Sequence, residues 1–375
     1  MNNPLRQLHD AGQSVWLDYI DRGMLHDGRL GQLIRNDALA GMTSNPTIFE
    51  KALSEGSAYD AQVASAADLS PAELFELIET DDVRAACDRF APVYSATNGR
   101  DGCVSIEVSP SQAFDAEATV AEARRLWRTV NRPNVMVKVP GTAEGARAIR
   151  ALIGEGINVN VTLLFALSAH ERVIDAYLAG LEDRLAAGHR IDHVASVASF
   201  FVSRVDTEVD RRLNARAAQS AGDEREKLLA LRGRAAIANA RLAYRLFRER
   251  FSGARWERLA AAGAMVQRPL WASTSTKNPE YRDVIYVEQL IGPDTVNTLP
   301  PATMDAFRDH GVVSRTVDSD FGGAERDLAA LGEAGIDLGQ VTGQLLGDGV
   351  AAFQKSFDTL LAGLARKSAA LVAAG

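Results

Sequence analysis

The chain has 375 residues, of which 46% are hydrophobic, 24% charged and 6% aromatic, a globular composition for one large domain or two average ones. Its formal net charge of -8 excludes binding that depends on a basic surface, so we expect neither a nucleic-acid nor a membrane partner. Phosphorylated small molecules need only a few local cations, so the net charge does not exclude them as ligands. The two cysteines, Cys87 and Cys103, cannot build a disulfide framework, and the N-terminal residues lack a signal-peptide pattern, so a cytoplasmic protein is expected.

The first half of the chain alternates short apolar strands with amphipathic helices. Strands are expected at 14–18, from residue 40, and at 103–109, 134–139 and 157–162, with helices at 71–90, 112–130 and 142–154. In the strands that hold Glu107, Lys138 and Asn160, aliphatic residues occupy one face and polar residues the other. Helices would cover both faces of an open parallel sheet, so the polar face favours a closed barrel with a polar lumen.

Three further strands, at 193–201, 265–272 and 295–299, complete the number that a (β/α)8 TIM barrel requires. A long helical insertion, 203–262, follows the sixth strand, and a helical C-terminal extension occupies 322–373. We therefore expect residues 1–375 to form a single α/β barrel domain. The extension either covers the barrel or meets a partner chain, and a homo-oligomer is compatible with the sequence.

Lys138 is the residue that packing explains least. Lysine is almost never buried without a partner, and this chain uses it sparingly. An amine removed from water loses hydration of its charged form, so its pKa is expected to fall and a neutral nucleophile becomes available. The alternative is a lysine whose stem packs in the sheet while its ammonium group reaches water. The strand by itself does not decide between them.

Barrel enzymes carry their chemistry at the carboxyl ends of the strands. The polar side chains expected there are Asp18, Asn45, Glu107, Lys138, Asn160, Thr162 and Ser199. A turn or cap would explain several of them singly, and Asn45 before Pro46 is a natural helix cap. Together they bring an amine, carboxylates, amides and hydroxyls to one mouth. The histidines show no metal-ligand spacing, and we expect no metal and no cofactor.

An anion site is predicted after the seventh strand. Ser273, Ser275 and Lys277 offer hydroxyls, backbone amides and a cation where the pattern indicates the start of a helix. Arg204, just past the sixth strand, adds a guanidinium group suited to phosphate. The alternatives are a capped Ser/Thr turn and a surface ion pair of Arg204 with Asp206 or Asp210.

Several segments resemble the transaldolase family, in the order and spacing of its motifs. They are MTSNPT at 42–47, SIEV at 105–108, VKVP at 137–140, GINVNVTLLF at 156–165 and WAST at 271–274. The resemblance implies that Lys138 forms a Schiff base and that Asp18 is the acid/base. It also implies that Glu107 and Thr162 hold a catalytic water. The long insertion and the C-terminal extension suggest the longer branch of the family.

The same resemblance assigns substrate contacts. It implies that Asn45, Asn160 and Ser199 contact the sugar, and that Arg204 and Ser273 bind its phosphate. Many family members have a second arginine two residues after that serine. This chain has Ser275 there and Lys277 two residues further on, so either could complete the site.

The implied reaction transfers a dihydroxyacetone unit from sedoheptulose 7-phosphate or fructose 6-phosphate to glyceraldehyde 3-phosphate or erythrose 4-phosphate, in the non-oxidative pentose phosphate pathway. Two alternatives stay open. One is a related lysine aldolase that releases free dihydroxyacetone from fructose 6-phosphate. Its members generally carry an amide at the Glu107 position and a tyrosine near Phe201, so both residues here favour transfer. The other is a barrel that binds sugar phosphate without catalysis.

Overall fold

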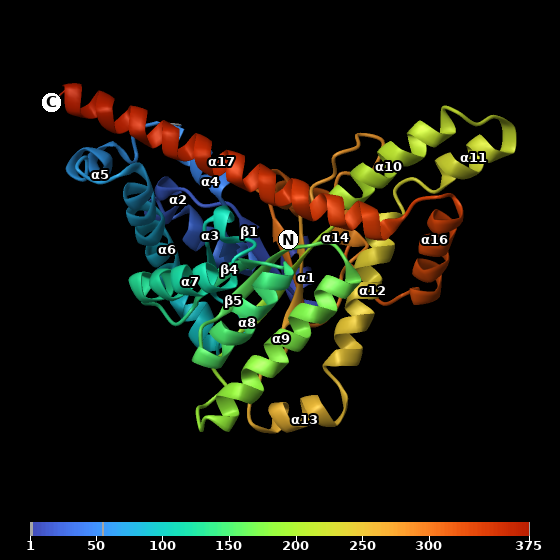
Figure 1. Ribbon diagram of the computed structural model, residues 1–375, viewed down its shortest axis with the longest axis horizontal. Helices are drawn as coiled ribbons and strands as arrows, with labels where there is room; N and C mark the ends of the chain where they lie inside the picture. Colours follow the sequence, from blue (N-terminus) through green and yellow to red (C-terminus); the bar gives the residue numbers. More distant parts are fainter. Residues whose placement is uncertain (1–2, 55, 375) are drawn as a thin grey trace.

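The computed structural model describes residues 3–54 and 56–374, and its centre is a closed barrel of parallel strands in chain order (Figure 1). The last strand pairs with the first, which closes the ring. The strands are β1 (Gln13–Asp18), β2 (Leu39–Thr43), β3 (Cys103–Glu107), β4 (Val135–Pro140), β5 (Val159–Leu164), β6 (Ser196–Phe201), β7 (Arg268–Ala272) and β8 (Thr295–Leu299). The predicted (β/α)8 barrel is confirmed.

Helices surround the barrel and extend beyond it. Up to β6 they are α1 (Pro4–Asp10), α2 (Arg22–His26), α3 (Arg29–Asp37), α4 (Pro46–Ser54), α5 (Asp60–Ser65), α6 (Pro71–Ala96), α7 (Ala116–Val130), α8 (Ala143–Glu155) and α9 (Leu167–Ala186). The later helices are α10 (Ser203–Ala217), α11 (Gly222–Ala230), α12 (Ala235–Arg250), α13 (Gly253–Ala261), α14 (Ile285–Glu288), α15 (Pro301–His310), α16 (Phe321–Glu333) and α17 (Leu338–Ala374). None of the described helices is long and apolar enough to cross a membrane.

The strand alternation decides what fills the lumen. Valines on β4 pack outward against α7 and α8, so that Met136 and Lys138 point inward. At the opposite end from the mouth, the buried Arg268 guanidinium lies 2.9 Å from Asp101 and donates a hydrogen bond of 2.7 Å to Ser14 Oγ. This network fills the barrel at the amino-terminal ends of the strands. The polar side chains that are free to contact a substrate therefore lie at the mouth.

The beginnings of β6 and β7 differ from the prediction. Each strand starts three residues later than expected, at Ser196 and Arg268. Before β6, the Val194 N–H bonds to the Ile191 carbonyl in a turn, and the Ala195 N–H bonds to the Asn158 side chain. Apolar residues in a buried turn look the same in sequence as residues of a buried strand, so composition could not separate the two.

The insertion and the extension are helical, as predicted. α10 to α13 form the insertion, in which α12 packs against α9 and α16. The long helix α17 runs along one side of the molecule and lies beside α4 (Figure 1). It also contacts α5, α6, α10 and β5, which places it over the carboxyl ends of the strands. The extension therefore covers the barrel mouth.

Candidate active site

Lys138 points into the barrel beside a carboxylate. It stands opposite Glu107 on β3 and Asn160 on β5, and its side chain is 7% exposed. Its Nζ lies 3.2 Å from Glu107 Oε2 and donates a hydrogen bond of 3.0 Å to the Ser44 carbonyl. The alternative of an ammonium group that reaches bulk water is wrong, because the amine is held inside the lumen.

Two carboxylates flank this amine, and both resist ionisation. Burial raises the pKa of Asp18, although Lys138, a hydrogen bond of 2.7 Å from Thr43 Oγ1 and Arg204 act in the opposite direction. Burial also raises the pKa of Glu107, and the charge of Lys138 offsets part of that effect. Each group therefore holds a proton more tightly than it would in water, as a residue that exchanges protons with a substrate requires.

Polar side chains on β5 and β6 form a fixed row next to the amine. Asn160 Nδ2 donates to Ser105 Oγ at 2.9 Å, and Ser199 Oγ donates to Asn160 Oδ1 at 2.7 Å. Among the described residues, the buried Thr162 Oγ1 has no hydrogen-bond partner, and neither does Glu107 Oε2 apart from its ion pair. Unsatisfied buried oxygens favour a site for water or substrate hydroxyls.

A cavity of about 190 Å³ opens above Lys138 at the mouth. The sequence-predicted residues that line it are Asp18, Asn45, Lys138, Thr162, Ser199, Arg204, Ser273, Ser275 and Lys277. Glu107 and Asn160 do not line this cavity; they lie behind its wall, in contact with Lys138 and Ser199. Asn45 also caps α4, because its Oδ1 accepts the Ile48 N–H at 3.1 Å. The cap interpretation of Asn45 is therefore correct and does not exclude a place in the site.

Sequence reasoning did not select several residues of the cavity wall, among them Thr43, Thr298 and Phe353. Thr43 Oγ1 lies 2.8 Å from Thr298 Oγ1 and binds Asp18, so the two threonines support the carboxylate. Thr43 is the last residue of β2 and Thr298 the last but one of β8, and this position near the carboxyl end of a strand could have indicated them. Phe353 comes from α17, and nothing local in a long helix indicates which turn meets the barrel.

Two cations converge at one end of the cavity. The Arg204 guanidinium lies 5.2 Å from the centre of the Phe201 ring, and Lys277 Nζ donates to Ser275 Oγ at 2.6 Å. Burial and the charge of Arg204 lower the pKa of Lys277. Neither cation has a carboxylate within 4.0 Å in the described part of the chain. Two cations with no carboxylate in direct contact are typical of an anion site.

The acids proposed as rivals for Arg204 are used elsewhere. Asp206 accepts hydrogen bonds from Tyr286 Oη and the Ala236 N–H, both at 2.8 Å. Asp210 accepts a hydrogen bond of 2.6 Å from Tyr281 Oη. The predicted alternative of a surface ion pair between Arg204 and either acid is therefore wrong, and the guanidinium is left for the cavity.

The predicted helix start after Ser273 is also wrong. Residues 273–284 form a loop, and the next helix, α14, begins at Ile285. Thr276 Oγ1 closes the loop by donating to the carbonyls of Arg282 and Asp283. The helix N-terminus at this end belongs to α10, where the Ser203 N–H donates to the Ser273 carbonyl at 3.0 Å.

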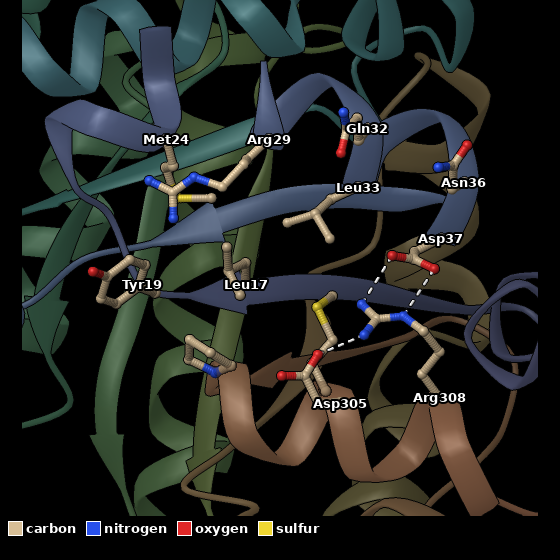
Figure 2. Close-up of a pocket in the computed structure, with 12 residues that line it drawn as sticks. Leu17, Tyr19, Met24, Arg29, Gln32, Leu33, Asn36, Asp37, Asp305 and Arg308 are labelled. Carbon is tan, nitrogen blue, oxygen red and sulfur yellow. Dashed lines mark hydrogen bonds and ion pairs between the residues drawn. The ribbon is translucent and has the colours of Figure 1, made fainter. Parts of the chain in front are cut away.

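A separate cavity of about 400 Å³ lies outside the barrel between β1, α3 and α15 (Figure 2). Arg308 crosses it and pairs with Asp37 at 2.9 Å and with Asp305 at 2.5 Å. No sequence-predicted site residue lines it. Within the described ranges, no group of three or more His, Cys, Asp or Glu side chains is arranged to hold a metal ion.

Comparison with known proteins agrees with this geometry. The family model described as "Transaldolase/Fructose-6-phosphate aldolase" matches residues 15–364. The chain is 51% identical over 373 residues to a protein of Thermobifida fusca named "Transaldolase", covering 99% of this chain and 100% of that one. It is 49% identical to "Transaldolase 1" of Streptomyces coelicolor, covering 96% and 94% of the two chains. It is 45% identical to "Transaldolase 2" of a Nostoc species, covering 97% of each. The chain therefore belongs to the transaldolase/fructose-6-phosphate aldolase family.

Proposed function

We propose that the protein is a transaldolase that carries a dihydroxyacetone unit from a ketose phosphate to an aldose phosphate on Lys138. The observation that carries the proposal is a buried amine 3.2 Å from Glu107, beneath a cavity lined by Asp18 and Arg204. The names of near full-length relatives support the same activity. Such a reaction belongs to the non-oxidative pentose phosphate pathway, and its phosphorylated substrates fit a cytoplasmic location.

The first half of the reaction forms and uses an imine. Lys138, after losing a proton to Glu107, attacks the ketone carbon, and loss of one water gives a protonated imine. Asp18 accepts the proton of the C4 hydroxyl as the C3–C4 bond breaks, and an aldose phosphate leaves. The bonding electrons enter the imine, which becomes an enamine on Lys138. The imine on Lys138 thus serves as the electron sink, and forming it needs only groups that the chain itself supplies.

The second half reverses these steps on another aldehyde. The enamine adds to the carbonyl carbon of the acceptor, Asp18 returns its proton to the new hydroxyl, and one water hydrolyses the imine. Glu107 and Thr162 are suited to hold that water, because an oxygen of each is buried without a hydrogen-bond partner among the described residues, the Lys138 ion pair aside. Asn45, Asn160 and Ser199 would bind the hydroxyls of the sugar.

The substrate phosphate belongs at the cationic end of the cavity. Arg204 supplies a guanidinium, Ser273 a hydroxyl, and Lys277 the second cation, with Ser275 holding its ammonium group at 2.6 Å. We assign the second charge to Lys277 because Ser275 is neutral. Sedoheptulose 7-phosphate and fructose 6-phosphate are the proposed donors, and glyceraldehyde 3-phosphate and erythrose 4-phosphate the proposed acceptors.

The alternative aldolase is less well supported. Glu107 and Phe201 occupy positions where the resemblance associates an amide and a tyrosine with aldolases, and the most similar relatives are named transaldolases. An aldolase would release dihydroxyacetone without an acceptor, whereas a transaldolase forms product only when an aldose phosphate is supplied. Product analysis with and without acceptor separates the two.

Borohydride reduction in the presence of fructose 6-phosphate tests the proposal directly. We expect a stable adduct on Lys138, identified by peptide mass analysis, and no adduct without borohydride. An active protein with unmodified Lys138 would exclude the mechanism. A protein that binds fructose 6-phosphate but gives neither adduct nor product would be a non-catalytic barrel.

A further inference from the structure

Glu107 borders a second cavity, which lies outside the barrel. This side cavity has a volume of about 640 Å³ and lies among α6, α7 and α17. Its lining includes Glu79, Glu107, Ser109, Glu122 and Phe357. Glu107 thus lines the side cavity, its buried carboxylate contacts the Lys138 amine, and the cavity at the barrel mouth lies beyond Lys138.

The side cavity exists because β2 and β3 separate before β3 ends. Their pairing stops at Met42 and Val104, whereas β3 stays paired with β4 up to Glu107 and Lys138. Beyond that point the Glu107 N–H has no partner on β2. It points instead at the carboxylate of Glu79 on α6, which is 4% exposed. Glu79 therefore replaces the missing strand and fixes the backbone of Glu107.

A carboxyl group is an unexpected choice for this contact. Glutamine could accept the same N–H without a buried charge. Burial, together with Glu107 on β3, Glu122 on α7 and Glu76 on α6, raises the pKa of Glu79 well above its usual range. Arg125 on α7 pairs with Glu76 and Glu122, and α17 contributes the uncharged Phe357. Glu79 thus holds its proton more tightly than it would in water, and it lies beside the backbone of Glu107, a group that the proposed reaction requires to exchange protons.

The reaction needs such an exchange while its mouth is covered. Imine formation releases one water and imine hydrolysis consumes one, so each cycle moves a water out and another in. In the proposed reaction the sugar fills the cavity at the mouth, whose wall includes Phe353 of α17. The side cavity approaches Glu107 from another direction, past polar side chains that can hold water.

We propose that Glu79 is a positioning residue for Glu107, and that the side cavity is the route by which Glu107 exchanges protons and water with solvent while sugar fills the mouth. The inference rests on the proposed transaldolase reaction. The net water balance is zero over a cycle, and no further reactant is required.

Glu79→Gln and Glu79→Leu test the positioning role. Gln keeps the acceptor for the Glu107 N–H but cannot ionise, and Leu removes both properties. In the parent protein, ionised Glu79 favours the protonated form of Glu107 at high pH. We therefore expect the ratio of kcat/KM of the Gln variant to that of the parent to rise at least threefold between pH 6 and pH 9. The Leu variant should be at least tenfold less active than the Gln variant at pH 7.

Either of two results would overturn the positioning role. One is a Gln-to-parent ratio that stays constant across this pH range. The other is equal activity of the Gln and Leu variants. The thermal midpoints of both variants are measured alongside. A Leu variant that does not fold leaves the pH ratio of the Gln variant as the deciding measurement.

Closing the side cavity tests the route. Thr129→Trp places a large side chain at its exposed rim, and Asn36→Trp is the matched control in the cavity of Figure 2. Each protein is incubated with fructose 6-phosphate in H₂¹⁸O without acceptor, and ¹⁸O entry into the ketone is measured against borohydride trapping at Lys138. We expect at least a fivefold drop for Thr129→Trp and no change for Asn36→Trp. Unchanged exchange in Thr129→Trp excludes the route. A parent protein without any adduct would instead refute the proposed function.

Discussion

Glu107 and Lys138 stand opposite each other in the β3–β4 ladder, and their charged atoms are 3.2 Å apart. Because both side chains are almost fully buried, each neutralises a charge that the lumen would otherwise exclude. In the proposed mechanism, the same contact serves to pass a proton from the amine to the carboxylate without a change of conformation. One geometric relationship therefore serves the stability of the site and, in the proposed mechanism, the activation of Lys138 as nucleophile.

Replacement of Lys138 by methionine should abolish turnover while keeping most of the side-chain volume. We expect activity to fall by a factor on the order of 10⁴ or more, because no other group can form the imine. Donor consumption is followed by coupled assay, and adduct formation by mass analysis after borohydride. Lys355→Met, at an exposed position on α17, is the control and should be fully active. Residual imine chemistry at another lysine would contradict the assignment.

Arg204 and Lys277 should act on substrate phosphate rather than on chemistry. A charged hydrogen bond contributes about 1.5–3 kcal/mol, so Arg204→Ala or Lys277→Ala should raise KM for fructose 6-phosphate roughly 10- to 100-fold. Activity on unphosphorylated fructose should change little. Lys227→Ala, on the exposed surface of α11, removes the same charge and should have no effect. An unchanged KM in Lys277→Ala would return the second phosphate contact to Ser275.

Tyr281 anchors the loop that carries Ser275 and Lys277. Its hydroxyl donates to Asp210 at 2.6 Å, and this bond joins the loop to α10. Tyr281→Phe should raise KM for phosphorylated donors by up to about tenfold, the value of one hydrogen bond, and leave kcat unchanged. Steady-state kinetics with phosphorylated and unphosphorylated donors checks this. Equal effects on both donors would show that the loop does not act through the phosphate.

Asp206 should make stability depend on pH. Burial raises its pKa from 3.8 to about 7, so the proton it binds in the folded state stabilises the protein at low pH. This stabilisation is complete below pH 3.8 and is lost as pH rises through about 7. Relative to the parent, Asp206→Asn should therefore gain unfolding free energy on the order of 4 kcal/mol between pH 4 and pH 8. Urea denaturation at both pH values measures the difference. If the difference in unfolding free energy between the variant and the parent is the same at both pH values, Asp206 is ionised at both of them.

Phe353 should keep water away from the enamine. It lines the cavity and is 7% exposed, so Phe353→Ala opens the mouth to solvent. We expect acceptor-independent release of dihydroxyacetone to rise about tenfold, because water protonates and hydrolyses the intermediate before an acceptor arrives. Trapping at Lys138 should persist. Gln354→Ala, the next residue on α17, is the control. A variant that still releases dihydroxyacetone at the parent's rate would assign the exclusion of water to other residues.

The sequence predicted what local patterns encode. Period-two alternation around Lys138 indicated its inward direction, and the succession of strands indicated a barrel, because both follow from short segments. Glu79 and Phe353 could not be found in this way, since each reaches the site from a helix whose rotation is set by tertiary packing. The prediction of where β6 starts failed for a related reason. The Ala195 N–H bonds to the Asn158 side chain, a tertiary contact that the local pattern does not encode.

The position of α17 has a consequence for biosynthesis. A ribosome that has reached Pro300 has already made all eight strands and the other residues of the sugar cavity wall, yet Phe353 is still to be translated. Before α17 is made, the cavity above Lys138 would lack the part of its wall that Phe353 supplies. It would then be open to any carbonyl compound in the surroundings. In the proposed mechanism, selective chemistry therefore requires that α17 has been made and has docked on the barrel.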